Sequence, residues 1–321
     1  MEYRNVGRTG VKVSSICLGT MTFGGEANEE ESRRIFGRSL DAGVNFIDTA
    51  DVYNAGRTEE IVGGLIRGRR DELVIVSKVF GRSFPGVNAG GSSRRHIVRA
   101  VEASLKRLGT DRLDFYLLHQ FDAAVPLEET LSALDDLVRR GLVLYVGASN
   151  FAAWQYMKAL GISERRGLER FSLIQPMYNL VKRQAEVEIL PMAKSEGLGV
   201  MTFSPLGAGL LSGRYAAAGA AGRLTENERY KRRYGQEGYE ETAERFVEYA
   251  KRAGVSPVTL AVAWCTSHPA VTAAIVGARS VEQLEPSLAA AEFVMAGAMR
   301  DEITALSPEV PLAHDRREEA S

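Results

Sequence analysis

The sequence predicts an α/β fold, a single (β/α)8 barrel domain over residues 1–321 with an N-terminal β-hairpin and two extra helices. Short, continuously apolar segments alternate with amphipathic ones, which is typical of a parallel sheet covered by helices. We count eight such strand–helix units after the hairpin. An open doubly wound sheet is the alternative, but it would normally carry a Gly-x-Gly-x-x-Gly fingerprint, which we do not find.

Composition and charge narrow the classes of function. The chain is 45% hydrophobic and 25% charged, with a net charge of -1, so nothing favours a nucleic acid or an anionic membrane surface as partner. The polar N-terminus and the lack of a long apolar run predict no signal peptide and no membrane span. Cys17 and Cys265 lie in apolar surroundings and are expected to be reduced thiols. We therefore expect a cytoplasmic protein without a metal site.

The first half of the chain gives four strand–helix units. Gly7 and Gly10 separate short segments in residues 3–13, which indicates a hairpin. Gly43 is a helix stop signal and Pro126 a start signal. Strands are expected at 15–20, 45–50, 73–79 and 113–118, each followed by a helix, at 29–41, 58–67, 93–108 and 126–140.

The second half continues the alternation. Strands are expected at 143–146, 171–175, 199–203 and 273–276. The expected helices cover residues 152–160, 185–196, 239–253, 257–267, 281–290 and about 298–306. Residues 147–150 would form a loop after their strand, and residues 207–238 a long loop rich in Gly, Ala, Arg and Tyr. The charged residues 308–321 would form a flexible tail.

Polar side chains occur where three successive strands end. Asp48 and Tyr53 follow the second barrel strand, Lys78 lies within the third, and His119 follows the fourth. Taken singly, a strand-end Asp is often a cap and a histidine is often part of the core. In a (β/α)8 barrel, however, the active site lies at the carboxyl ends of the strands. Four such residues at neighbouring strand ends therefore predict a catalytic site.

These four residue types suit the reduction of a carbonyl group. A buried Lys78 needs a partner, and Asp48 on the neighbouring strand is the obvious one. A lysine ammonium beside Tyr53 should stabilise the phenolate and lower the pKa of Tyr53 towards neutrality. Tyr53 could then give a proton to a carbonyl oxygen that His119 orients by a hydrogen bond. The hydride would have to come from a cofactor.

Several short motifs follow one another at ordinary spacing between about residues 3 and 305. They are Gly19-Thr20-Met21-Thr22-Phe23-Gly24, Asp48-Thr49-Ala50-Asp51-Val52-Tyr53 with Gly56-Arg57-Thr58-Glu59, Ser77-Lys78, Leu117-Leu118-His119 and Gly147-Ala148-Ser149-Asn150-Phe151. Together they resemble the aldo-keto reductase superfamily, in particular its bacterial-type branch. The resemblance implies a (β/α)8 barrel that binds NADP(H) without a Rossmann fold and reduces small carbonyl substrates. Its catalytic tetrad maps onto Asp48, Tyr53, Lys78 and His119.

The resemblance also implies a set of cofactor contacts. Those near the catalytic residues are Gly19, Thr20, Met21 and Asp48, with Ser149, Asn150 and Gln175 at the nicotinamide carboxamide. Phe203 would stack on the nicotinamide ring, and Ser204, Leu206, Gly209, Leu210 and Arg214 would follow the pyrophosphate. Gly277, Arg279 and Gln283 match the adenosine end, where Arg279 could bind a 2′-phosphate and favour NADPH over NADH. Pro286-Ser287 replaces the acid and asparagine common in relatives, so the adenine contacts should differ.

Substrate recognition and two other functions stay open at this point. Apolar side chains near the expected mouth are Met21, Phe23, Phe84, Phe121 and Trp154, and residues 82–91 and 207–238 are candidate lids. The chain is also similar to potassium-channel β-subunits, which implies an NADPH-binding, redox-sensing accessory subunit as the alternative. An intact His119 favours catalysis, because that position is replaced in those subunits. A reductase of nucleotide-linked keto sugars is a further alternative, and the oligomeric state is open.

Overall fold

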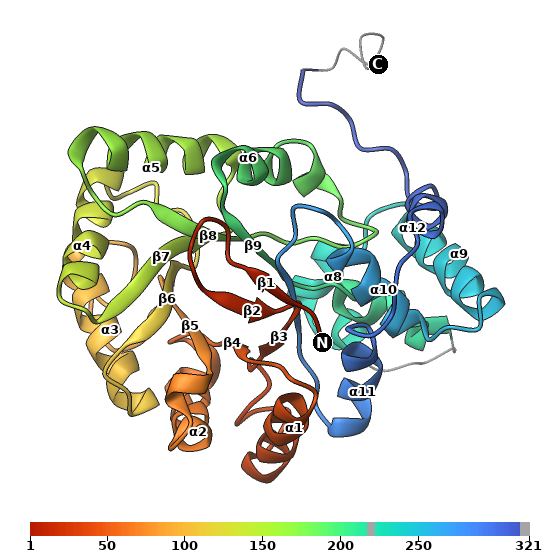
Figure 1. Cartoon of the computed structure of the whole chain (residues 1–321), viewed down its shortest axis with the longest axis horizontal. Helices are drawn as coiled ribbons and strands as arrows, with labels where there is room; N and C mark the ends of the chain where they lie inside the picture. Colours follow the sequence, from red (N-terminus) through yellow and green to blue (C-terminus); the bar gives the residue numbers. More distant parts are fainter. Residues whose placement is uncertain (217–221, 315–321) are drawn as a thin grey trace.

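A computed structural model describes residues 1–216 and 222–314, and its centre is a closed barrel of eight parallel strands (Figure 1). In the barrel the last strand, β10, lies between β3 and β9, and the others follow in chain order. This confirms the predicted fold class. The barrel strands are β3 (Ile16–Gly19), β4 (Phe46–Asp48), β5 (Val74–Val79), β6 (Leu113–Leu118), β7 (Val143–Ser149), β8 (Phe171–Gln175), β9 (Gly199–Thr202) and β10 (Ala273–Val276).

Helices surround the barrel because each strand buries both faces and each helix has one apolar side. All six residues of β5 are buried, and α3 begins at the Ser93 cap and ends at Gly109, whose φ is 62°. The helices that follow the strands are α1 (Glu29–Asp41), α2 (Arg57–Ile66), α3 (Arg94–Leu108), α4 (Leu127–Arg139), α5 (Ala153–Arg166), α6 (Ile189–Glu196), α10 (Pro257–Thr266) and α11 (Val281–Ala289). Additional helices are α9 (Tyr239–Arg252) and α12 (Gly297–Thr304).

The predicted hairpin closes the amino end of the barrel. Its strands, β1 (Tyr3–Asn5) and β2 (Lys12–Ser14), pair antiparallel. Val6 and Val13 pack into the cluster that fills the barrel interior. The Arg8 amide donates to the carbonyl of Gly197, just before β9 begins, at 3.0 Å. The active-site end is therefore the opposite, carboxyl end of the strands.

The structure corrects two details of the sequence interpretation. Strand β7 continues to Ser149, so three of the four residues expected to form a loop at 147–150 belong to the strand. Small residues allow this, because a Cβ on Gly147 would lie 2.0 Å from the carbonyl oxygen of Leu173 in β8. The expected loop 207–238 contains the 3-10 helices η4 (Gly207–Ser212) and η5 (Arg214–Ala216) and the helices α7 (Arg223–Glu226) and α8 (Glu228–Tyr234).

Two further predictions fall partly outside the described residues. Residues 217–221 of the long connection and residues 315–321 of the predicted tail are not described. Residues 308–314 contain no helix or strand.

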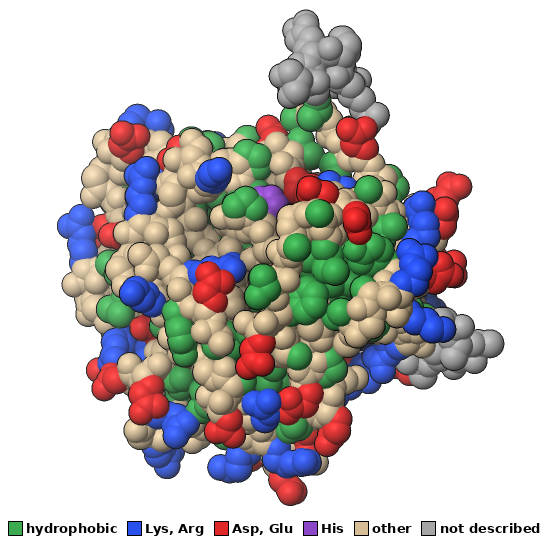
Figure 2. All heavy atoms as spheres, turned by 45° about the vertical axis from the view of Figure 1, so that its right-hand side comes forward, with side chains coloured by type: hydrophobic (Ala, Val, Ile, Leu, Met, Phe, Trp, Pro, Cys, Tyr) green, Lys and Arg blue, Asp and Glu red, His purple; other side chains and the backbone are tan. Residues whose placement is uncertain are grey.

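Among the described residues, no helix has the length and apolar character needed to cross a membrane. On the face drawn in Figure 2, acidic and basic side chains are interspersed, as expected for a net charge of -1.

Candidate active site

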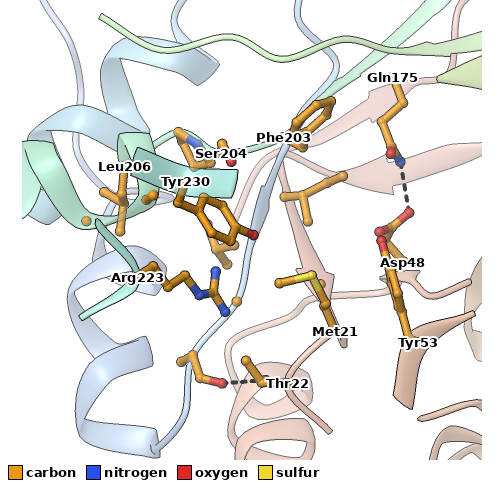
Figure 3. Close-up of a pocket in the computed structure, with 18 of the residues that line it drawn as sticks. Met21, Thr22, Asp48, Tyr53, Gln175, Phe203, Ser204, Leu206, Arg223 and Tyr230 are labelled. Atoms are coloured by element: carbon orange, nitrogen blue, oxygen red, sulfur yellow. Dashed lines mark hydrogen bonds between the residues drawn. The ribbon is translucent and has the colours of Figure 1, made fainter. Parts of the chain in front are cut away.

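A pocket of about 1220 Å³ opens where the barrel strands end (Figure 3). Its lining includes the residues that follow β4 and β6 and those that follow β9 and β10. Most of the sequence-predicted site residues share this one pocket. They are Gly19, Met21, Asp48, Tyr53, His119, Ser149, Asn150, Gln175, Phe203, Ser204, Leu206, Gly209, Arg214, Gly277, Arg279 and Gln283.

Three predicted site residues lie behind the pocket wall. Lys78 is fully buried under Asp48 and Tyr53. The hydroxyl of Thr20 donates to the carbonyl of Asp48 at 2.9 Å, and the residue is fully buried. Leu210 is 7% exposed and belongs to the hydrophobic core. Thr20 and Leu210 can therefore shape the pocket from behind, but they do not form its surface.

The buried ammonium of Lys78 is surrounded by oxygen atoms. Its Nζ lies 2.6 Å from Oδ1 of Asp48, and it donates hydrogen bonds to the carbonyl of Thr49 at 2.8 Å and to the hydroxyl of Tyr53 at 3.4 Å. Adjacent strands cause this meeting, because β4 and β5 pair in parallel with Asp48 opposite Val76. A charge taken out of water needs such partners, since an unpaired one would be very costly.

The pKa shifts of Lys78 and Tyr53 are set by burial as well as by the neighbouring charges. Burial acts to lower the pKa of Lys78, but the carboxylate of Asp48 and the phenol of Tyr53 raise it, so the ammonium keeps its proton. Burial raises the pKa of Tyr53, and Lys78 opposes that rise only in part. The prediction of a lowered Tyr53 pKa is therefore wrong for this structure. Asp48 neutralises the lysine charge at 2.6 Å, which leaves Tyr53 as a protonated phenol at neutral pH.

His119 lies beside the tyrosine and is neutral. The ring centroids of His119 and Tyr53 are 6.0 Å apart, with an interplanar angle of 77°. Burial lowers the pKa of His119 to about 3, and the positive charges of Lys78 and Arg229 lower it as well. The backbone of His119 is held by Val79 and by the side-chain amide of Asn150. A neutral imidazole in a fixed position can form a hydrogen bond to a ligand.

Amide side chains connect the strand ends on the other side of Asp48. Gln175 donates to Oδ1 of Asp48 at 2.9 Å, as Figure 3 shows, and accepts from the hydroxyl of Ser149 at 3.2 Å. Asn150 adopts a φ of 57° and donates to Ser149 at 3.0 Å. These contacts orient polar groups around the pocket floor, so the site can recognise a planar group with donors and acceptors.

The connection after β9 forms a tightly bent wall. Positive φ values occur at Ser204 (58°), Ala208 (58°) and Gly209 (93°), and Asn179 donates to the carbonyl of Ser204 at 2.8 Å. Phe203 precedes this wall and faces the pocket in Figure 3. Small residues in left-handed conformations let a ligand approach the backbone closely.

The sequence interpretation missed the residues of α7 and α8 that line the pocket. They are Arg223, Arg229, Tyr230 and Arg233. The basic run at 229–233 was a signal for this cationic segment, but it has no apolar stripe and gave no helix prediction. In Figure 3 Tyr230 lies beside Arg223, and its hydroxyl points towards Met21.

One carboxylate joins two arginines on this side of the pocket. Glu26 lies 2.9 Å from Arg223 and 2.8 Å from Arg279. Arg279 lies in the loop between β10 and α11, whereas Arg223 belongs to the long connection after β9. Glu26 thus ties the two segments together. Across residues 1–216 and 222–314, no cluster of three or more His, Cys, Asp or Glu side chains could hold a metal ion.

An eight-stranded parallel barrel with a polar pocket at the carboxyl ends of its strands is the arrangement of a (β/α)8-barrel enzyme. The chain belongs to the aldo/keto reductase family, whose model matches residues 15–308. The protein therefore has the general role of an oxidoreductase. The family generally uses a nicotinamide cofactor and acts on small carbonyl substrates.

Relatives with different names are similar to this chain over almost its whole length. An uncharacterized oxidoreductase, YrpG, of Bacillus subtilis is 40% identical over 305 residues, which is 91% of this chain and 92% of the relative. A probable voltage-gated potassium channel subunit beta of Arabidopsis thaliana is 36% identical over 92% of each chain. A versiconal hemiacetal acetate reductase of Aspergillus parasiticus is 32% identical over 91% of this chain and 93% of its own length.

Proposed function

We propose that the protein is an NADPH-dependent reductase that converts aldehydes or ketones to alcohols. The observation that carries this proposal is the group of Lys78, Asp48 and Tyr53 beside His119 at the mouth of the barrel. Asp48 holds the ammonium of Lys78 in place, with 2.6 Å between Nζ and Oδ1. Lys78 in turn donates a hydrogen bond to the hydroxyl of Tyr53, which is a protonated phenol at the pocket. A neutral His119 stands next to it.

The positive charge of the pocket lining supports the binding of a phosphorylated dinucleotide. Its lining contains five arginines and two acids, of which Asp48 is already paired with Lys78. Arg214 and Arg279 would bind phosphates, and the bent wall at 204–209 would allow the pyrophosphate to approach the backbone. Phe203 would pack on the nicotinamide ring, with Ser149, Asn150 and Gln175 at its carboxamide. Pro286 and Ser287 line the pocket, and at the adenosine end they would offer an apolar ring and a hydroxyl in place of charged groups.

Residues of the chain would donate the proton to the substrate and stabilise the charge that remains. The bound nicotinamide supplies a hydride for the carbonyl carbon. The Tyr53 hydroxyl gives its proton to the carbonyl oxygen as negative charge develops there. Lys78 then stabilises the resulting phenolate from 3.4 Å, and Asp48 keeps the lysine protonated and in place. His119 donates a hydrogen bond that orients the carbonyl oxygen towards Tyr53.

Cofactor titration and one variant test the proposal. We expect NADPH to quench the protein fluorescence at lower concentration than NADH, and 4-nitrobenzaldehyde to cause loss of the reduced-nicotinamide absorbance. Tyr53→Phe should retain NADPH binding and lose at least about 100-fold in turnover, since it lacks the proton donor. The control is Tyr249→Phe, whose hydroxyl bonds to Glu302 on the surface. Unchanged turnover in Tyr53→Phe would overturn the proposed role.

The potassium-channel relatives support a second candidate. Because a channel β-subunit from Arabidopsis thaliana is 36% identical, the chain could instead act as an NADPH-binding, redox-sensing accessory subunit. That function predicts tight NADPH binding, negligible turnover of every carbonyl compound and a stable complex with a membrane channel. Turnover that depends on Tyr53 and His119 would reject it.

A further inference from the structure

The arginines of the pocket fall into two groups. Arg214 packs against the bent wall, close enough that a Cβ on Gly209 would lie 3.1 Å from its Cδ, and Arg223 and Arg279 share Glu26. These three lie along the part of the pocket proposed for the cofactor phosphates. Arg229 and Arg233 come instead from α8, which covers the pocket from the side of the long connection.

Helix α8 is held over the pocket by aromatic contacts. The ring of Tyr230 has the guanidinium of Arg223 at 5.6 Å from its centroid and that of Arg233 at 5.4 Å. The contact with Arg223 joins α8 to α7. Tyr234 anchors the other end of α8, because it is buried in the hydrophobic core and its hydroxyl accepts a hydrogen bond from Asn179 at 3.3 Å. Arg229 and Tyr230 line the same pocket as Tyr53 and His119. The first turn of α8 therefore borders the pocket that contains the catalytic residues.

Arg229 precedes Tyr230, and its side chain is exposed to solvent. Its guanidinium makes no hydrogen bond or ion pair within the part of the chain that the structure describes. Glu228, the nearest acid in sequence, is paired with Lys231 at 2.9 Å. Arg229 lines the same pocket as His119, and its charge helps to lower the pKa of that histidine. An exposed arginine without an ion-pair partner among the described residues is thus available to a ligand in this pocket.

We propose that Arg229 is a specificity residue that selects carbonyl substrates bearing an anionic group, a carboxylate or a phosphate. This rests on the proposed reductase function and adds a substrate class to it. The planar guanidinium offers two parallel N–H donors to either anion. The apolar side chains of Met21, Phe80 and Phe121 also line the pocket and would contact an apolar body between the carbonyl and the anion.

Matched aldehydes test the proposal on the full-length protein with NADPH. The probes are 4-formylbenzoate, 4-formylphenyl phosphate and the neutral isostere 4-formylbenzamide. We expect kcat/KM to be at least about tenfold higher for one or both anions than for the amide, as for a charge-assisted hydrogen bond. The preference should decrease at high salt. A gain for the carboxylate alone or the phosphate alone would identify which anion the site accepts.

Variants test whether Arg229 causes the preference for anionic aldehydes. Arg229→Ala should abolish the anion preference and leave kcat/KM for 4-formylbenzamide within about twofold. The matched control is Arg232→Ala, an exposed arginine of the same helix outside the pocket lining. Equal turnover of all three aldehydes by the wild type would overturn this inference alone. Loss of NADPH binding in Arg229→Ala, with equal effects on every aldehyde, would also overturn it and place Arg229 on the cofactor. No turnover of any aldehyde would overturn the proposed function and this inference together.

Discussion

Glu26 and Arg223 form an ion pair of 2.9 Å although they are 197 residues apart in sequence. The same carboxylate lies 2.8 Å from Arg279, the residue proposed to bind the 2′-phosphate of NADPH. The phosphate and Glu26 would therefore compete for one guanidinium. Binding of NADPH should release Glu26 from Arg279, while NADH would leave that contact undisturbed.

Glu26→Gln should strengthen NADPH binding selectively. Removal of the competing carboxylate frees Arg279, and a half-exposed pair of this kind is worth about 0–1 kcal/mol, or up to about fivefold in Kd. We expect the Kd for NADPH, measured by fluorescence quenching, to fall within that range and the Kd for NADH to fall less, because NADH has no 2′-phosphate for Arg279 and gains only from the release of Arg223. Glu60→Gln is the control, because Glu60 pairs with Arg57 outside the pocket lining. Equal changes for both cofactors would contradict this competition.

The pH profile of kcat/KM should show no change near neutral pH that is caused by titration of a histidine. Burial lowers the pKa of His119 to about 3, so the imidazole stays neutral over the whole range from pH 5 to 8. Burial raises the pKa of Tyr53, so the proton donor is lost only above its ordinary pKa of about 10. We expect kcat/KM for aldehyde reduction to be flat between pH 5 and 8 and to fall in strongly alkaline solution. A limb near pH 6.5 that disappears in His119→Gln would contradict the neutral role.

Asp51→Asn should stabilise the fold at neutral and alkaline pH. Asp51 is buried, accepts a hydrogen bond from Ser83 and leaves Oδ1 unpaired, and burial raises its pKa to about 7. The unfolded chain, with an ordinary carboxyl pKa, loses this proton first as the pH rises. The contribution of Asp51 to the free energy of unfolding should therefore fall between about pH 4 and 7.

Urea unfolding at pH 5 and pH 8 measures this effect. The asparagine variant should be more stable than the wild type by about 1–3 kcal/mol at pH 8, and the difference should shrink at pH 5. The variant retains an oxygen that can accept from Ser83. A variant that is less stable at both pH values would show that the charged form of Asp51 is favoured inside the protein.

Gly147→Ala should weaken the barrel. A Cβ at this position would lie 2.0 Å from the carbonyl oxygen of Leu173, at the point where the register of β7 and β8 shifts. Backbone must move, so we expect a loss of about 3 kcal/mol or more in thermal or urea unfolding. Gly37→Ala is the matched control: it lies in α1 with open space around it, and should gain about 0.5–1 kcal/mol. Similar stability of the two variants would mean that β7 and β8 separate easily.

The barrel was predictable because apolar strands buried on both faces alternate with amphipathic helices. The meeting of Asp48 and Lys78 followed from the same topology, since neighbouring parallel strands end side by side. The position of α8 was not predictable, because it depends on tertiary contacts of Tyr230 with Arg223 and of the buried Tyr234 with the core. The pKa of Tyr53 was wrongly predicted for a related reason. Sequence indicates which charge is nearby, but burial and the pairing of Lys78 decide the sign.

The N-terminal hairpin has a kinetic consequence. Val6 and Val13 fill the amino end of the barrel, so the described pocket is entered from the carboxyl end. A substrate that binds before the nicotinamide would then block the entry of the cofactor. The result would be a dead-end complex. Excess aldehyde should therefore inhibit the protein, and the alcohol should be released before the oxidised dinucleotide. Product-inhibition patterns would then be those of a compulsory-order sequence.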